Sequence, residues 1–237
     1  TGECQRALTQ LNVVGDLDGK ALPMVQTYRE AIACEVYREA VFAGKHTPLI
    51  FGDPERWVAS ILQALALSAD GNHAQAQELR EEAFEDAPAV SGSIDGESFE
   101  WLADADSRLG PMLEAIVNGK YYWVPMNRIA RITVEEPADL RDSVWTPVYF
   151  TWANGGDAPG LVPTRYPGSA GSSDDRIRLA RLTEWEEKAE GVYHGLGQRI
   201  LATDAGDTPL MDARQIQWDH PEVETPDADS DAGAADG

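Results

Sequence analysis

A change of hydrophobic pattern inside one short stretch most constrains how this chain can fold. Before residue 88, apolar residues recur at the spacing of helices; after residue 99, short apolar runs alternate with turn residues. The change falls in Phe99–Pro125, FEWLADADSRLGPMLEAIVNGKYYWVP, where aromatic residues flank an acidic loop. The sequence therefore predicts a helical part followed by a strand-rich part.

The first part, residues 1–88, has the pattern of an all-α domain. A helix from Pro23 places Tyr28 and Ile32 on one face, and a second helix starting at Asp53-Pro54 carries Trp57 and Ile61. Six residues after Trp57 match the register of a 34-residue tetratricopeptide repeat: Ala64, Leu67, Gly71, Ala76, Ala83 and Pro88. We therefore expect a tetratricopeptide-like superhelix over residues 1–88 that binds a peptide or helix.

The second part, residues 89–218, is expected to be an α+β domain with a mainly antiparallel sheet. A small, polar connector over 88–98 marks the domain boundary. A short helix is predicted over 112–118, ended by Asn118-Gly119, and a strand begins at YYWVP. Further strands are predicted over 127–134, 146–152, 161–166, 176–185, 195–203 and 210–218. Residues 219–237 carry seven acidic side chains and few apolar ones, so they are predicted to form a disordered tail.

The net charge of −22 over 237 residues argues against two classes of partner. Such an acidic surface repels nucleic-acid phosphates and anionic lipid, so neither nucleic acid nor a membrane is expected as a partner. Two isolated cysteines, Cys4 and Cys34, form no disulfide framework, and no signal peptide or membrane span is recognised. A soluble cytoplasmic protein is the expectation.

The nearest thing to a catalytic constellation is Asp104 and Asp106 with Arg108. In one reading they hold a divalent metal or act as an acid–base pair, which predicts a metal-dependent hydrolase. In the other reading they cap a helix after Gly110 and form ion pairs with the arginine. Common hydrolase and nucleotide-binding motifs are missing and the four histidines are scattered, so we expect no enzyme, no metal and no cofactor. The aromatic residues are expected to form core, with an exposed subset able to anchor a partner.

Several motifs resemble one known family. FEWLADADSRLGPMLEAIVNGKYYWVP, PADLRDSVWTPV, LVPTRYPGS, LARLTEW and GLGQR occur here in the order typical of the ImpE family, also called TagJ, of type VI secretion accessory proteins. The resemblance covers about residues 1–218 and excludes the acidic tail. It implies a further helical segment before Thr1.

The resemblance also implies a cytoplasmic, non-enzymatic adaptor. Family members bind the N-terminal helix of the small contractile-sheath subunit and are linked to the AAA+ unfoldase that recycles the sheath. A sheath helix in a groove of the helical part would use Tyr28, Ile32, Trp57 and Ile61 as anchors. A second surface would involve Trp101, Asp104, Asp106, Arg108 and Tyr122. The alternatives are the metal-dependent hydrolase and a general protein-binding scaffold.

Overall fold

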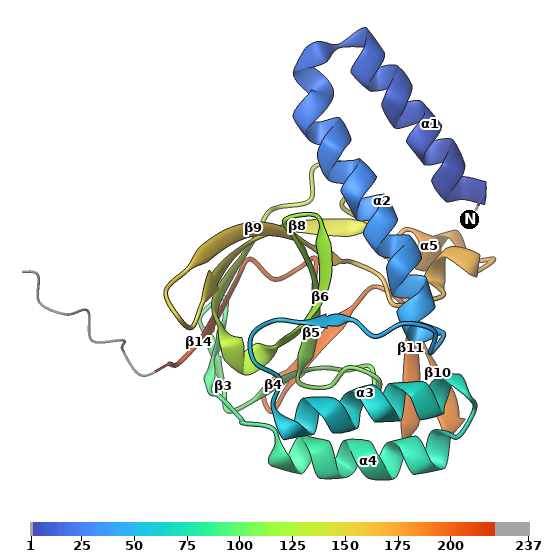
Figure 1. The fold of residues 1–237 in the computed structure, drawn as a ribbon. Coiled ribbons are helices and arrows are strands. Elements are labelled where there is room, and N and C mark those ends of the chain that lie inside the picture. Colours follow the sequence, from blue (N-terminus) through green and yellow to red (C-terminus); the bar gives the residue numbers. More distant parts are fainter. Residues whose placement is uncertain (1, 221–237) are drawn as a thin grey trace, which may run out of the picture.

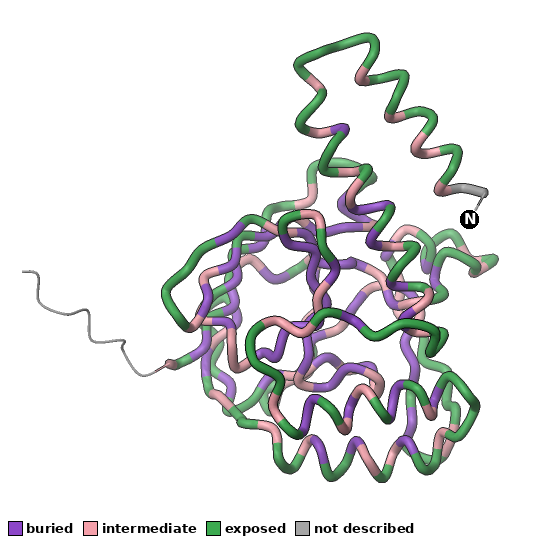
Figure 2. Tube along the Cα trace, viewed as in Figure 1, coloured by how far each residue is buried: buried purple, intermediate pink, exposed green. Residues whose placement is uncertain are grey.

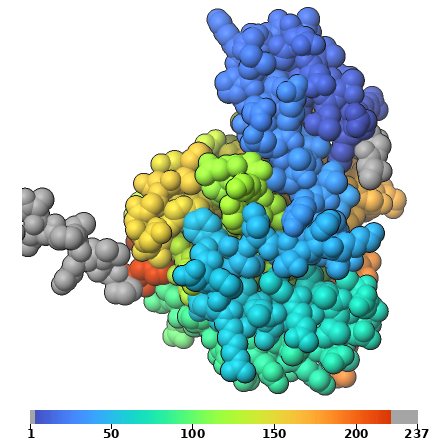
Figure 3. Space-filling model, viewed as in Figure 1, coloured from blue at the N-terminus to red at the C-terminus, as the bar shows by residue number. Residues whose placement is uncertain are grey.

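The chain opens with two helical hairpins in the computed structural model, which describes residues 2–220 (Figure 1). The first pairs α1 (Gly2–Leu17) with α2 (Leu22–Phe42) through the 3-10 turn η1 (Gly19–Ala21), and the second pairs α3 (Arg56–Ala69) with α4 (His73–Asp86). The tip of the first hairpin stands out from the body, as the space-filling view shows (Figure 3). No helix among these residues is long and apolar enough to cross a membrane. The predicted acidic tail lies, from residue 221 onward, outside the described residues.

Small residues bring α3 and α4 together as the repeat register predicts. Ala64, Ala76 and Ala83 are buried, and Gly71 makes the turn between the helices at φ +82°. A glycine adopts this left-handed conformation without steric penalty. α3 begins at Arg56, with Glu55 in the N-cap position, so the predicted start, with Asp53 as N-cap and Pro54 as the first helical residue, was two residues too early.

The rest of the chain is mostly antiparallel sheet. The largest sheet has nine strands in the order β1-β6-β5-β9-β8-β7-β14-β2-β3, and it curves round one core (Figure 1). Their bounds are β1 (Leu49–Ile50), β2 (Gly92–Ile94), β3 (Glu97–Phe99), β5 (Met112–Val117), β6 (Lys120–Pro125), β7 (Ile129–Val134), β8 (Trp145–Trp152), β9 (Asp157–Pro163) and β14 (Gln215–Trp218). A three-stranded sheet holds β4 (Leu102–Asp104), β12 (Ile200–Thr203) and β13 (Gly206–Pro209), and β10 (Thr183–Ala189) pairs with β11 (Val192–Gly197).

β5 separates two hydrophobic cores, and for that reason all six of its residues are buried (Figure 2). Leu113, Ala115 and Val117 face the core inside the curved sheet. Met112 and Ile116 face the second core, which lies between the sheet and the helices. Strand side chains alternate between the two faces, so Glu114 also points toward the helices.

The predicted helix over 112–118 is therefore wrong. A strand covered on both faces reads as a continuous apolar run, and its spacing does not distinguish it from a short buried helix. Asn118 and Gly119 have φ values of +50° and +70° and join β5 to β6 as a tight hairpin turn. Asn-Gly between two apolar runs is a strong hairpin signal, and here it outweighs the helix-ending reading.

Two other expectations need correction. The connector predicted over 88–98 contains β2 and enters β3, both of which belong to the large sheet. The strand predicted over 176–185 divides into the short helix α5 (Asp175–Arg178) and the start of β10. β2 and β3 were missed because each has only three residues, too few to show the alternation that identifies a strand.

The predicted α+β class, with helices first and a mainly antiparallel sheet after them, is confirmed. The proposed boundary between a domain over 1–88 and one over 89–218 stays a prediction. β1 lies between the two helical hairpins and pairs in parallel with β6, the only parallel pair among the described strands. Trp123 of β6 packs against Phe42 of α2, with ring centroids 5.7 Å apart.

Gly119→Ala tests the hairpin turn. Alanine at φ +70° is strained in a way that glycine is not, so we expect a loss of about 1 kcal/mol or more in unfolding free energy. Urea denaturation measures it. Gly171→Ala is the control, because nothing lies within 4 Å of the added methyl group and its φ is not positive. Equal stability of the two variants would contradict the turn assignment.

Candidate functional site

The acidic loop after β4 is shaped by its own side chains. The Asp104 carboxylate accepts a hydrogen bond from the Asp106 backbone N–H at 2.8 Å, and Asp106 accepts one from the Arg108 N–H at 2.9 Å. Aspartates form such turns readily because the carboxylate mimics a backbone carbonyl two residues away. The predicted helix-capping role is wrong, since β5 follows Gly110 where a helix was expected. The predicted ion pair with Arg108 is present, at 2.5 Å.

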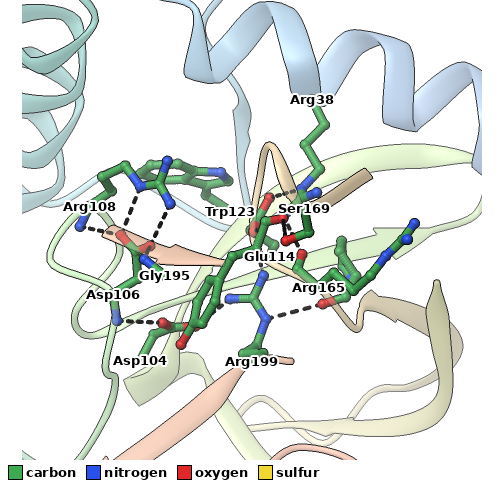
Figure 4. Close-up of polar contacts among 12 residues, drawn as sticks. Arg38, Asp104, Asp106, Arg108, Glu114, Trp123, Arg165, Ser169, Gly195 and Arg199 are labelled. Atoms are coloured by element: carbon green, nitrogen blue, oxygen red, sulfur yellow. Dashed lines mark hydrogen bonds and ion pairs between the residues drawn. The ribbon is translucent and has the colours of Figure 1, made fainter. Parts of the chain in front are cut away.

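A buried glutamate, Glu114 of β5, lies at the centre of a polar network (Figure 4). Arg38 of α2 donates to it from Nε at 2.5 Å and from Nη2 at 2.9 Å. The Tyr121 hydroxyl donates at 2.5 Å and in turn accepts from the Trp123 indole N–H at 2.7 Å. Arg199, which follows β11, also donates to Glu114. One carboxylate thus joins a helix, two strands and a loop.

Arg199 extends the network to the acidic loop. Its guanidinium pairs with Asp104 as well as Glu114, and it donates to the Pro163 carbonyl at 3.1 Å. Asp106 accepts from the side chain of Arg108 and from the backbone N–H of Gly195 at 2.7 Å. Both loop aspartates and Arg199 are buried, so these charges are held by one another and by the backbone.

The pKa shifts follow from this pairing. Burial acts to raise the pKa of Glu114, but the charges of Arg38 and Arg199 outweigh it and lower the pKa to about 2. Burial likewise opposes ionisation of Asp106, yet Arg108 holds its pKa below the usual value. The pKa of Asp104 is raised to about 6 because burial exceeds the attraction of Arg199. Within residues 2–220, no three His, Cys, Asp or Glu side chains gather in a way that could hold a metal ion.

Tyr121→Phe tests the network with a minimal change. The variant removes one donor to Glu114 and leaves the fully buried Trp123 N–H without its partner, so we expect a loss of about 1–3 kcal/mol in unfolding free energy. Tyr122→Phe is the control, because Tyr122 is half-buried, and its expected change is below about 0.5 kcal/mol. Urea midpoints that match for the two variants would contradict the role of Tyr121.

A histidine pair joins α4 to β11 beside the acidic loop. The rings of His73 and His194 meet edge-on with centroids 5.6 Å apart. Burial, reinforced by the positive charge of Arg108, lowers the pKa of His194 to about 4. Nearby, the buried Arg80 of α4 donates to the Ser68 hydroxyl, while its Nε and Nη1 have no partner among the described residues. The surroundings of His194 therefore favour its neutral form.

The low pKa of His194 predicts a loss of stability in mild acid. The unfolded chain, with a histidine pKa near 6.5, takes up the proton first, so this contribution is full above pH ~6.5 and is lost as the pH falls toward 4. Asp104, whose pKa is raised to about 6, has the opposite effect: its protonation stabilises the folded chain as the pH falls over part of this range. The natural chain is therefore compared with His194→Gln, which keeps Asp104. Urea midpoints at pH 7, 5.5 and 4.5 should fall further for the natural chain than for the variant. Parallel curves would contradict the shift.

An apolar pocket of about 460 Å³ is lined in part by the acidic loop. Trp57 of α3, Phe84 of α4, Trp101 and Trp218 contribute to its walls, together with Leu102 and Met126. Trp101 remains 41% exposed, whereas Trp57 and Trp218 are buried. We call this site the Trp101 pocket. Its apolar walls and size are typical of a binding site.

A second glutamate fixes one wall of the Trp101 pocket. Glu55 accepts hydrogen bonds from the Trp57 indole at 3.0 Å, from Arg128 at 3.0 Å and from the Asn127 amide nitrogen at 3.4 Å. The start of α3 is thereby tied to the 3-10 turn η2 (Met126–Arg128) after β6. Asn127 lines the pocket, and its buried Oδ1 has no partner in the part of the chain that the structure describes. Glu55 thus holds two residues of the pocket wall, Trp57 and Asn127, in place.

The structure brings together four of the nine predicted partner-binding residues. Trp57, Trp101, Asp104 and Asp106 all line the Trp101 pocket. Ile32 and Ile61 are buried in the core between the helices and the sheet.

The other three do not line the pocket. Tyr28 is partly exposed under Arg141, whose guanidinium carbon lies 4.7 Å from the ring centroid. Tyr122 packs edge-on against Phe51, and Arg108 is paired with Asp106 beside the pocket. The aromatic residues thus divide, as expected, into core and a partly exposed subset.

Sequence reasoning missed the centre of the network. Arg38 occupies a position of the buried stripe that Ala31, Cys34 and Val41 define on α2, so a charged residue at an apolar position was the available signal. Glu114 was the corresponding signal inside the apolar run MLEAIV. No such signal pointed to Arg199 or Asn127, because only the fold brings these two residues near the loop.

Comparisons with known proteins point in one direction. Residues 96–217 match the family described as ImpE protein. The chain is 52% identical over 218 residues to the type VI secretion system accessory component TagJ of Pseudomonas aeruginosa. The aligned residues make up 92% of this chain and 76% of that relative. A crystal structure of a Vibrio parahaemolyticus protein superposes with a TM-score of 0.82 at 26% identity, covering 93% of this chain and 82% of that one.

Proposed function

Because the chain belongs to the ImpE, or TagJ, family of type VI secretion accessory proteins, we propose that it is a non-enzymatic adaptor of the cytoplasm. It binds the N-terminal helix of the small contractile-sheath subunit and links the sheath to the AAA+ unfoldase that recycles it. The observation that carries the proposal is the Trp101 pocket, an apolar hollow with an exposed tryptophan at the meeting point of helices and sheet. Tryptophans in such positions are frequent binding hot spots.

The acidic loop supports the adaptor over the hydrolase. In a metal-dependent hydrolase, Asp104 and Asp106 would offer free lone pairs to a cation. Here Asp104 pairs with Arg199, and Asp106 pairs with Arg108 and the Gly195 N–H. Carboxylates engaged in this way act as a scaffold for the loop, whose small residues Ala103, Ala105 and Gly110 line the pocket together with the two aspartates.

Calorimetric titration of the full chain with a synthetic peptide of the cognate sheath subunit's N-terminal helix tests the proposal. We expect saturable binding in the micromolar range, about −8 kcal/mol, with a negative heat-capacity change from burial of apolar surface. A scrambled peptide of the same composition is the control. Heats that match the scrambled peptide would overturn the sheath-binding role.

The link to the unfoldase has its own test. Purified unfoldase should co-elute with the chain in size-exclusion chromatography, alone or with the sheath peptide present. Separate elution under both conditions would remove the unfoldase from the proposal while leaving sheath binding in place.

A further inference from the structure

The Trp101 pocket has a shape and chemistry that define the class of its occupant. Its walls come from α3, α4, β4 and β14, and they are mostly apolar. A volume of about 460 Å³ exceeds that of one side chain and suits two bulky side chains on neighbouring turns of a helix. Trp101 is 41% exposed, so an arriving helix would cover surface that is now open to water.

Exposed acidic residues lie next to wall residues along the chain, and we call them the acidic rim. Asp86 follows the α4 residues of the wall, Glu100 precedes Trp101, and Asp219 follows Trp218; all three are exposed. Asp204 is also exposed and accepts hydrogen bonds from the backbone N–H groups of Glu100 and Trp101. Arg56, beside Trp57, is the exposed cation that adjoins the wall, so negative charge prevails.

We propose that the Trp101 pocket takes bulky apolar side chains from an amphipathic helix whose neighbouring residues are lysine or arginine. Apolar contact supplies the affinity, and the acidic rim orients the basic helix and speeds its association with the chain. That this helix belongs to the sheath subunit rests on the function proposed above. The chemistry of the pocket stands without that identification.

Two single variants of the full chain test the site. Trp101→Ala should weaken binding of the sheath peptide at least tenfold, because it removes the exposed wall. Trp185→Ala is the matched control: Trp185 is 40% exposed on β10, away from the pocket, and its change should stay within twofold. Circular dichroism confirms that both variants remain folded. Sheath-peptide binding that Trp101→Ala leaves unchanged would overturn the site and spare the proposed function.

A second pair of variants tests the rim. The triple variant Asp86→Asn, Glu100→Gln, Asp219→Asn should slow association severalfold at low salt, and the difference should vanish near 0.5 M salt as screening shortens the range of the charges. The control neutralises three exposed glutamates on and beside β10, with Glu184→Gln, Glu187→Gln and Glu190→Gln, and changes the net charge equally. Equal slowing by both triple variants would show a general charge effect and overturn the role of the rim.

Model peptides separate this inference from the sheath-binding proposal. Two helical peptides share the same Leu and Trp residues and differ only in having Lys or Glu at the flanking positions. Binding of the Lys peptide alone, lost in Trp101→Ala, supports the pocket chemistry even if the sheath peptide fails. Equal binding, or binding that does not depend on Trp101, overturns it. Saturable binding of indole with no binding of either peptide would assign the pocket to a small ligand and equally overturn the inference.

Discussion

The placement of one buried carboxylate determines how the helices meet the sheet. Glu114 points from β5 into the core beneath α2, where an unpaired charge would cost several kcal/mol. It is satisfied only when Arg38 of α2, Tyr121 of β6 and Arg199 after β11 converge on it. A slip of α2 by one turn would separate Arg38 from Glu114 and leave both charges buried. The network therefore contributes specificity of packing, while the apolar contacts of the two cores contribute most of the stability.

The apolar pocket follows from the same constraint. The carboxylates of Asp104 and Asp106 are engaged by arginines and backbone N–H groups, so the loop that carries them can line an apolar pocket together with its alanines and glycine. Gly110 shows how closely this wall is packed: a methyl group there would come within 2.2 Å of the Phe84 ring. An acidic loop thus forms part of an apolar site.

Sequence alone predicted the features that depend on local periodicity and missed those that depend on contacts across the fold. The α3–α4 hairpin was predictable because its small packing residues, Ala64 and Ala76, and its turn residue, Gly71, follow one another at fixed spacing in the sequence. β5 was not, because burial on both faces removes the alternation that identifies a strand. For the site, Trp57, Trp101, Asp104 and Asp106 were predicted and do share a pocket. Arg199, which pairs with Asp104, and Asn127, which donates to Glu55, were unpredictable, because their contacts are with chain segments far away in sequence.

The position of the Trp101 pocket also bears on how an adaptor of this kind would release its partner. Walls from α3, α4, β4 and β14 exist together only in the assembled fold, so an occupant would stabilise the junction of helices and sheet as it binds. A helix that becomes ordered only on binding loses part of its interaction energy to that ordering. Two apolar anchors and a screened acidic rim would then give the proposed helix moderate affinity with fast exchange, which an adaptor of the proposed kind needs in order to release its partner.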